Sequence, residues 1–211
     1  MSKFWSNIFG KKVFPKDDIN EDVRGPHMPS KEIPVEQTFA QKFTAKGGKF
    51  VYCEQLNEAK DAFISIVKEY PSEIRELLCL DNILADKLDV GITLTKTNLN
   101  AKVMLCSCES LVAYDGSVVV CERQLGSNKL SDLPDTLIIL AGTSQFTKTV
   151  SDGLKNIKHR FSDNIPLNIT SIKQFKSDAI TDENYMNYGS SVKEVYLISV
   201  SYTHLTLPTR L

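Results

Sequence analysis

The chain has 211 residues, 42% hydrophobic and 24% charged, and this ordinary globular composition excludes a fibrous repeat and wholesale disorder. Its 25 Lys and Arg residues stand against 26 Asp and Glu residues, so no net positive charge gathers phosphates and nucleic acid is not an expected partner. The longest apolar runs, such as residues 137–141, fall far short of the roughly 20 residues that cross a bilayer, so we expect no transmembrane segment.

The cysteines form an odd set of five that cannot all pair within one chain. They are Cys53, Cys79, Cys106, Cys108 and Cys121. The sequence also lacks a basic start followed by a long apolar stretch and a small-residue cleavage site, so we expect no secretory signal. Reduced thiols and the lack of an export signal predict a cytoplasmic location.

Residues 1–35 are predicted to be an N-terminal amphipathic extension followed by a linker. Apolar side chains at roughly helical spacing are mixed with lysines, and a Pro-rich and charge-rich stretch follows. A short basic helix of this kind either docks on a partner or membrane surface or covers the domain's own surface. The side chains that would make this contact are Phe4, Trp5, Ile8 and Phe9.

Strands and helical patterns alternate from residue 49 onward. The predicted strands, from short runs of apolar and β-branched residues, are 49–53, 77–80, 103–106, 118–121, 137–141 and 195–198. Between them we predict a helix from Asn57 to Pro71, a short helix capped by Asp81 or Asn82, and a helix after Gln145. This alternation predicts an α/β fold with a mainly parallel sheet flanked by helices, because parallel neighbours need crossover connections.

The helix after Gln145 is expected to bury one apolar face. Phe146, Val150, Leu154 and Ile157 recur at helical spacing, and the helix is expected to end near residue 158.

The α/β domain is predicted to span residues 36–199. Residues 200–211 break from the preceding pattern and are predicted to be a non-native tail, such as a read-through of adapter or vector sequence. The competing interpretation is a natural C-terminal strand.

Glu109 is the best candidate for a reactive group. It follows the strand that ends at Cys106, at the edge where the loops of an α/β sheet converge on ligands. A carboxylate there acts as a nucleophile or general base, or it is a first-turn Glu that interacts favourably with a helix dipole.

Three glycine-containing loops are candidate ligand-binding segments. The first contains Gly116 and Ser117, either in a tight hairpin or at the exit of a short helix. The second contains Gln124 and Gly126 after a strand, and it either binds a ligand or turns the chain. The third joins a strand to a helix, where free N–H groups and hydroxyls bind an anion or serve as an ordinary helix cap. Its candidate residues are Thr143, Ser144 and Gln145, after Gly142.

The sequence predicts no metal site and no cofactor. Cys106 and Cys108 have a single residue between them, whereas structural zinc sites use two to four and need a second ligand pair. These thiols are therefore interpreted as small buried residues. Neither a GxGxxG fingerprint nor a Walker lysine accompanies the glycine loops.

Several segments in order resemble the LUD domain, the lactate utilization protein C family. They are Cys108–Ser117, Leu133–Pro134 leading into Leu137–Ile139, Ser144–Gln145, and an opening segment at Phe43–Phe50. The resemblance extends from about Phe39 to Ile198. Asn168–Ile172 stands where the family has a Gly-Pro-Ser-Arg-Thr-Ala-Asp-like segment, which indicates a divergent branch.

The resemblance implies a three-layer α/β fold of the NagB/RpiA/CoA-transferase type. It also implies a role in bacterial oxidation of L-lactate to pyruvate beside iron–sulfur partner proteins, with a small anionic metabolite as ligand. Whether the chain is itself an enzyme is left open. The alternative is a free-standing transferase or ligase that acts on a CoA ester, sugar phosphate or folate, with Glu109 as its nucleophile or base.

Overall fold

The computed structural model describes residues 33–70, 76–88, 91–176 and 192–201. Most of the predicted N-terminal extension, including Phe4, Trp5, Ile8 and Phe9, and all but the first two residues of the predicted tail lie outside these ranges. No helix among the described residues is long and apolar enough to span a membrane.

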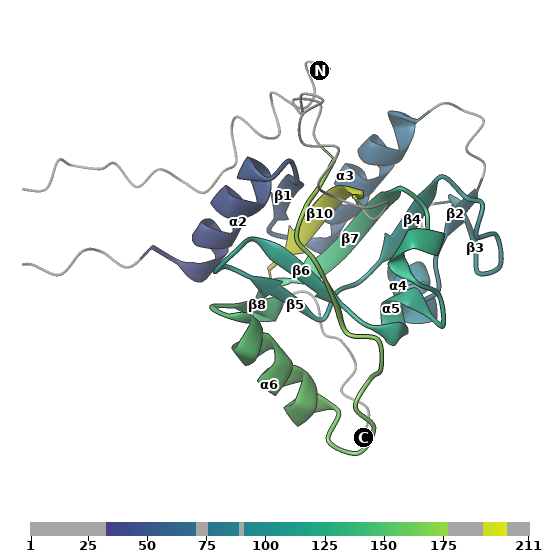
Figure 1. Ribbon diagram of the computed structural model, residues 1–211. Helices are drawn as coiled ribbons and strands as arrows, with labels where there is room; N and C mark the ends of the chain where they lie inside the picture. Colours follow the sequence, from purple (N-terminus) through teal and green to yellow (C-terminus); the bar gives the residue numbers. More distant parts are fainter. Residues whose placement is uncertain (1–32, 71–75, 89–90, 177–191, 202–211) are drawn as a thin grey trace, which may run out of the picture.

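A six-stranded, fully parallel sheet forms the centre of the fold, in the order β1-β10-β7-β4-β2-β3 (Figure 1). Its strands are β1 (Lys49–Cys53), β2 (Glu76–Leu78), β3 (Thr93–Thr95), β4 (Val103–Cys106), β7 (Thr136–Gly142) and β10 (Glu194–Val200). Every residue of β4 and β7 is buried, as expected for central parallel strands covered on both faces. The predicted α/β class with a mainly parallel sheet is confirmed.

Helices cover one face of this sheet. They are α3 (Leu56–Lys68) and α4 (Asn82–Lys87). Helix α3 buries Ala59, Ala62, Phe63 and Ile66, most of the apolar face that the sequence predicts. Its N-cap is Gln55 rather than the predicted Asn57, whereas Asp81 caps α4 as predicted by accepting the N–H groups of residues 83 and 84.

A smaller sheet covers the opposite face, in the order β8-β5-β6-β9. Its strands are β5 (Ser110–Val112), β6 (Ser117–Val120), β8 (Phe146–Thr147) and β9 (Thr170–Ile172). Its inner side chains, such as Leu111 and Val118, pack against Leu137 and Leu197 of the main sheet. The predicted strand at 118–121 therefore exists, but it pairs antiparallel with β5 in this second sheet.

The remaining helices pack around the second sheet. They are α2 (Val35–Ala45), α5 (Glu122–Leu125) and α6 (Val150–Arg160), and single 3-10 turns lie at Leu130–Asp132 and Thr143–Gln145. Helix α2, which was not predicted, buries Phe39 and Phe43 in the core between the two sheets. Helix α6 lies beside the second sheet (Figure 1), and its Ile157 packs against Val112 and Val119 of that sheet.

Two predictions about the segment after β7 are wrong. No helix follows Gln145 directly, because the chain first forms β8 beside β5 and only then begins α6, capped by Thr149. Leu154, predicted to be buried, is 42% exposed, and Gly153 occupies the buried face in its place. The buried face of α6 runs through Val150, Gly153 and Ile157, which leaves Leu154 at its exposed margin.

The C-terminal end of β10 continues through Val200, and the Ser201 N–H donates a hydrogen bond to the carbonyl of Cys53 at 3.1 Å. These first residues of the predicted tail therefore extend the sheet. The non-native origin of the segment stays a prediction.

Candidate functional site

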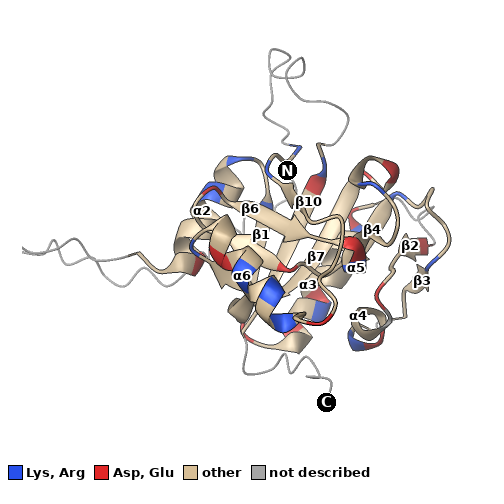
Figure 2. Ribbon diagram, turned by 60° about the horizontal axis from the view of Figure 1, so that its bottom comes forward, with Lys and Arg blue, Asp and Glu red and all other residues tan. Residues whose placement is uncertain are grey.

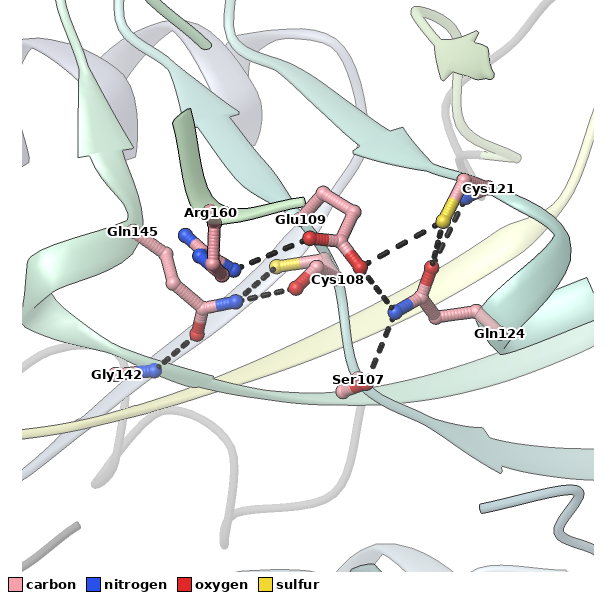
Figure 3. A network of polar contacts seen from close by, with 8 residues as sticks. All are labelled: Ser107, Cys108, Glu109, Cys121, Gln124, Gly142, Gln145 and Arg160. Atoms are coloured by element: carbon pink, nitrogen blue, oxygen red, sulfur yellow. Dashed lines mark hydrogen bonds and ion pairs between the residues drawn. The ribbon is translucent and has the colours of Figure 1, made fainter. Parts of the chain in front are cut away.

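The candidate site lies where the chain crosses from the main sheet to the second sheet. Strand β4 ends at Cys106, three residues follow, and β5 begins at Ser110. Side chains from three other segments of the chain form hydrogen bonds with these three residues, Ser107, Cys108 and Glu109 (Figure 3). The crossing lies at the carboxyl edge of the parallel sheet, where α/β folds bind ligands.

Glu109 is the centre of this network, and its side chain is 3% exposed. One carboxylate oxygen, Oε2, accepts from Arg160 Nη1 at 3.1 Å. The other, Oε1, accepts from Gln124 Nε2 at 2.9 Å, and the Cys121 Sγ lies 3.6 Å from it. A buried carboxylate is tolerated when it is paired and hydrogen-bonded, and both oxygens here have partners.

Gln124 links Glu109 to the start of α5. Its Oε1 accepts the Cys121 backbone N–H at 2.9 Å and the Cys121 thiol at 3.2 Å, while its Nε2 also donates to Ser107 Oγ at 3.3 Å. The hydrogen bond from the Cys121 N–H to Gln124 Oε1 also closes the amino end of the short helix, as part of a capping box. Gln124 therefore fixes the β6–α5 junction against the crossing segment.

Gln145 fixes the crossing segment from the side of β7. Its Oε1 accepts the Gly142 N–H at 2.6 Å, and its Nε2 donates to the Cys108 carbonyl. The side chain is 6% exposed. Two buried glutamines from different loops thus hold residues 107–109 from opposite directions (Figure 3).

The other candidates of the third loop are more accessible. Thr143 is half-buried and Ser144 is exposed, in the single 3-10 turn that ends at Gln145. Because α6 begins only at Val150, this turn does not lie at the amino end of a long helix. The dipole of a long helix therefore does not assist anion binding at this loop.

Gly116 and Ser117 lie in the turn between β5 and β6, so the hairpin alternative is the correct one. Gly116 has φ +68°, and a Cβ atom there would come within 2.6 Å of the Phe43 backbone nitrogen. Asp115 closes the turn by accepting from the Ser117 N–H and Oγ at 3.1 and 2.6 Å. Because Gly116 has no side chain, helix α2 can pack closely against this turn. No contact among the described residues joins the turn to the Glu109 network.

Gly126 ends α5. It has φ +64°, a conformation that favours glycine, and its N–H donates to the Glu122 carbonyl at 2.7 Å. The second candidate loop therefore contributes Gln124 to the network, while Gly126 shapes the end of the helix that carries it.

The sequence did not single out Arg160 or assign Cys121 to the site. Arg160 is the last residue of α6 and stands 51 positions after Glu109, so no spacing pattern connects them. The available signal was the position of Arg160 in the last turn of a helix, which is equally typical of an ordinary exposed cation.

Burial suppresses thiolate formation at the cysteines around the site. It raises the pKa of Cys121 to about 11 and that of Cys106 to about 12, and it raises the pKa of Cys108 well above the usual value for a thiol. Thiolates are the reactive and metal-binding form, so these side chains act as small buried residues. Within the described ranges, no three His, Cys, Asp or Glu side chains gather closely enough to hold a metal ion.

Comparison with known proteins identifies the family. The LUD domain matches residues 36–197. The structure is similar to the crystal structure of a DUF162 family protein from Deinococcus radiodurans, with a TM-score of 0.56 and 15% sequence identity over 79% of this chain and 96% of that chain. No curated protein matches the sequence. Since the domain match covers most of the chain, this protein belongs to the LUD domain family.

Proposed function

We propose that this protein supports bacterial L-lactate utilization, the oxidation of L-lactate to pyruvate, together with iron–sulfur partner proteins. Membership of the LUD domain family over residues 36–197 is the observation that carries the proposal, since lactate utilization is the role that the family resemblance implies. The five free thiols, all buried, agree with the cytoplasmic location that is part of the proposal.

The Glu109 network supports a ligand-binding role in this process. Arg160 is 44% exposed and donates from Nη1 to Glu109. A guanidinium carries five N–H donors in a planar fork that matches a carboxylate. The outer edge of Arg160 is therefore our proposed binding point for a small anionic metabolite such as lactate, with Glu109 holding the arginine in place.

A growth experiment tests the proposed role. Deletion of the gene should abolish or slow growth of the source bacterium on L-lactate and leave growth on pyruvate unchanged, and the wild-type gene should restore it. Arg160→Gln should restore growth poorly, whereas Lys155→Gln, which changes an exposed cation on the same helix, should restore it fully. Unchanged growth of the deletion strain, with no compensating paralogue, contradicts the proposal.

The second candidate function is a transferase or ligase that acts on a CoA ester, sugar phosphate or folate. The observation that favours it is the position of Glu109 at the carboxyl edge of the parallel sheet, three residues after the end of β4. Attack of its carboxylate on an acyl-CoA would form a glutamyl anhydride and release the CoA thiolate. The burial of Glu109 gives this candidate less support, because Arg160 or Gln124 would first have to move aside.

Trapping of the anhydride distinguishes the two functions. Incubation with a panel of acyl-CoAs followed by hydroxylamine should leave a modified Glu109, detected by peptide mass spectrometry, if the chain is a transferase of this kind. Glu109→Gln should abolish the modification. A chain that forms no adduct with any member of the panel is not a covalent transferase for these substrates.

A further inference from the structure

Helix α6 is attached to the domain by little apolar surface. It buries only Gly153 and Ile157 of its eleven residues, whereas α2 and α3 bury three and four residues that include phenylalanines. Most of its other residues are exposed, and lysine and arginine colour parts of the helix blue in Figure 2. Since glycine has no side chain, Ile157 is the single fully buried apolar side chain of α6. A helix of this length is marginal in water by itself, so α6 depends on a small contact to stay folded.

The apolar cluster under α6 is separate from the main core. It consists of Val112, Val119 and Ile157, with Val150 and Phe161 partly buried at its margin. The two clusters that cover the faces of the main sheet are far larger, and neither includes a residue of α6. Detachment of α6 therefore leaves both large clusters intact. Segments held by few buried apolar contacts are the ones that open locally.

Helix α6 lies directly over the start of β5, beside the buried Glu109. A Cβ atom on Gly153 would stand 2.5 Å from Ser110 Oγ, so the helix backbone rests on the residue after Glu109. Ile157 packs against Val119, whose carbonyl accepts the Glu109 N–H at 2.8 Å. Two positions of α6 therefore contact the immediate neighbours of Glu109.

The contact of α6 with the carboxylate itself is polar. Arg160 donates to Glu109 Oε2 at 3.1 Å, and its side chain is 44% exposed, so water can replace this partner when the helix leaves (Figure 3). Gln124, which donates to Oε1 at 2.9 Å, belongs to α5 and not to α6. Departure of α6 would thus free Oε2 and leave Oε1 hydrogen-bonded, which presents one carboxylate oxygen in a fixed orientation.

We propose that α6 is a movable cover over Glu109. The helix detaches as a unit while both sheets stay folded, and each opening exposes Oε2 of Glu109 to solvent and ligands. The closed state protects a buried ion pair, and the open state offers the free carboxylate that the transferase candidate requires. The inference does not rest on the lactate role, since it concerns access to Glu109 and no metabolite takes part.

Native-state hydrogen exchange at low urea concentrations tests the opening. In the wild type, the backbone amides of residues 154–160 should exchange faster than those of the central strand β7. Ile157→Ala, which removes the main apolar contact, should accelerate exchange in α6 by roughly tenfold or more, and the milder Ile157→Val should accelerate it less. The matched control is Glu194→Gln, which weakens the hydrogen bond to Lys49 at an edge of the main sheet that stays folded in the open state.

The two kinds of variant separate local opening from global unfolding. Glu194→Gln should accelerate exchange in β7 but leave exchange in α6 unchanged, because the open state keeps the Glu194 contacts. The Ile157 variants should accelerate exchange in α6 while it stays faster than in β7. If the amides of α6 are as protected as those of β7, or respond to Glu194→Gln as those of β7 do, the helix exchanges only by global unfolding and the proposal is overturned.

Carboxyl labelling tests whether the opening uncovers Glu109. A water-soluble carbodiimide with glycinamide labels accessible carboxyl groups, and peptide mass spectrometry locates the label, with the 86% exposed Asp135 as internal reference. Ile157→Ala keeps both Arg160 and Glu109, so labelling of Glu109 should rise by a factor similar to that of α6 exchange, whereas Glu194→Gln should leave it unchanged. Faster exchange without faster labelling of Glu109 overturns the proposal. None of these outcomes bears on the lactate growth experiment, so the two proposals fail separately.

Discussion

Arg160 at the end of α6 pairs with Glu109 at the start of the second sheet, with 3.1 Å between Nη1 and Oε2. The carboxylate is 3% exposed and the guanidinium 44% exposed, so the arginine covers a charge that would otherwise be buried without a cationic partner. This one contact ties the outer helix to the segment that joins the two sheets.

Removal of the arginine should therefore destabilise the protein. We expect Arg160→Met to lower the free energy of unfolding by about 2–3 kcal/mol, below the usual cost of breaking a fully buried pair because Arg160 is partly exposed. Urea denaturation of this variant and of Glu109→Gln provides the measurement. Glu109→Gln should cost less, because an amide leaves no unpaired buried charge, and equal costs for both variants would argue against this account.

Gly153 should resist replacement although it lies inside a helix. A Cβ atom at this position would stand 2.5 Å from Ser110 Oγ, whose hydroxyl is already hydrogen-bonded to Thr147 at 2.9 Å. Gly153→Ala should lower stability by about 1–3 kcal/mol through overpacking, against the gain that alanine normally gives in a helix. Ser151→Ala, on the exposed face of the same helix, is the matched control and should change the unfolding free energy little.

The same close approach predicts a coupling between these two positions. Combining Gly153→Ala with Ser110→Ala should cost less than the sum of the single changes, because removal of the Ser110 hydroxyl relieves the contact. Strictly additive unfolding free energies in the double variant would show that overpacking against Ser110 is not the cause.

The amino edge of the main sheet should make stability sensitive to acid. Glu194 accepts from Lys49 at 2.6 Å and from Tyr70 at 3.1 Å. Burial favours the protonated form, but these hydrogen bonds and the charge of Lys49 hold the pKa of Glu194 below its ordinary value. A depressed folded-state pKa adds stability above the unfolded value of about 4.3, and this stability is lost as pH falls through the folded pKa.

Replacement of this glutamate should flatten that dependence. Glu194→Gln should be less stable than the wild type at neutral pH by about 1–2 kcal/mol, and the difference should shrink below the ordinary Glu pKa. Chemical denaturation at a series of pH values provides the test. A difference between the two proteins that stays constant from neutral to acidic pH would exclude this role for Glu194.

The buried thiols should be unreactive in the folded protein. Burial raises the pKa of Cys79 to about 11, of Cys106 to about 12 and of Cys121 to about 11, so almost no thiolate exists at pH 8. Iodoacetamide at that pH should label the native protein slowly and the urea-unfolded protein rapidly, as followed by intact mass. Fast labelling of Cys121 in native protein would show that the Glu109 network opens frequently.

The sequence alone predicted the local elements of this fold. Continuous apolar runs identified β4, β7 and β10, because strands covered on both faces need apolar side chains at every position. Gly116 marked the β5–β6 turn because few other residues adopt its backbone conformation. The position of Glu109 at the end of a strand also followed from these runs.

Longer-range relationships could not be predicted in this way. The apolar run at 118–120 fits a parallel or an antiparallel strand equally well, and its pairing with β5 in a second sheet depends on which surfaces meet. Helix α2 was missed because only three of its eleven residues are buried, so its apolar face is narrow. Leu154 was misplaced because the buried face of α6 runs through Gly153, and a glycine carries no apolar side chain that a pattern could reveal.

The candidate site, like the fold, was predicted only in part from the sequence. Sequence determined that Glu109, Gln124 and Gln145 follow closely after strands, since local patterns fix where strands end. Only the tertiary structure decided that the two glutamines and Arg160 converge on residues 107–109, while the turn at Gly116 packs against α2. A buried carboxylate needs partners in space rather than at a fixed spacing along the chain, and folding alone supplies them.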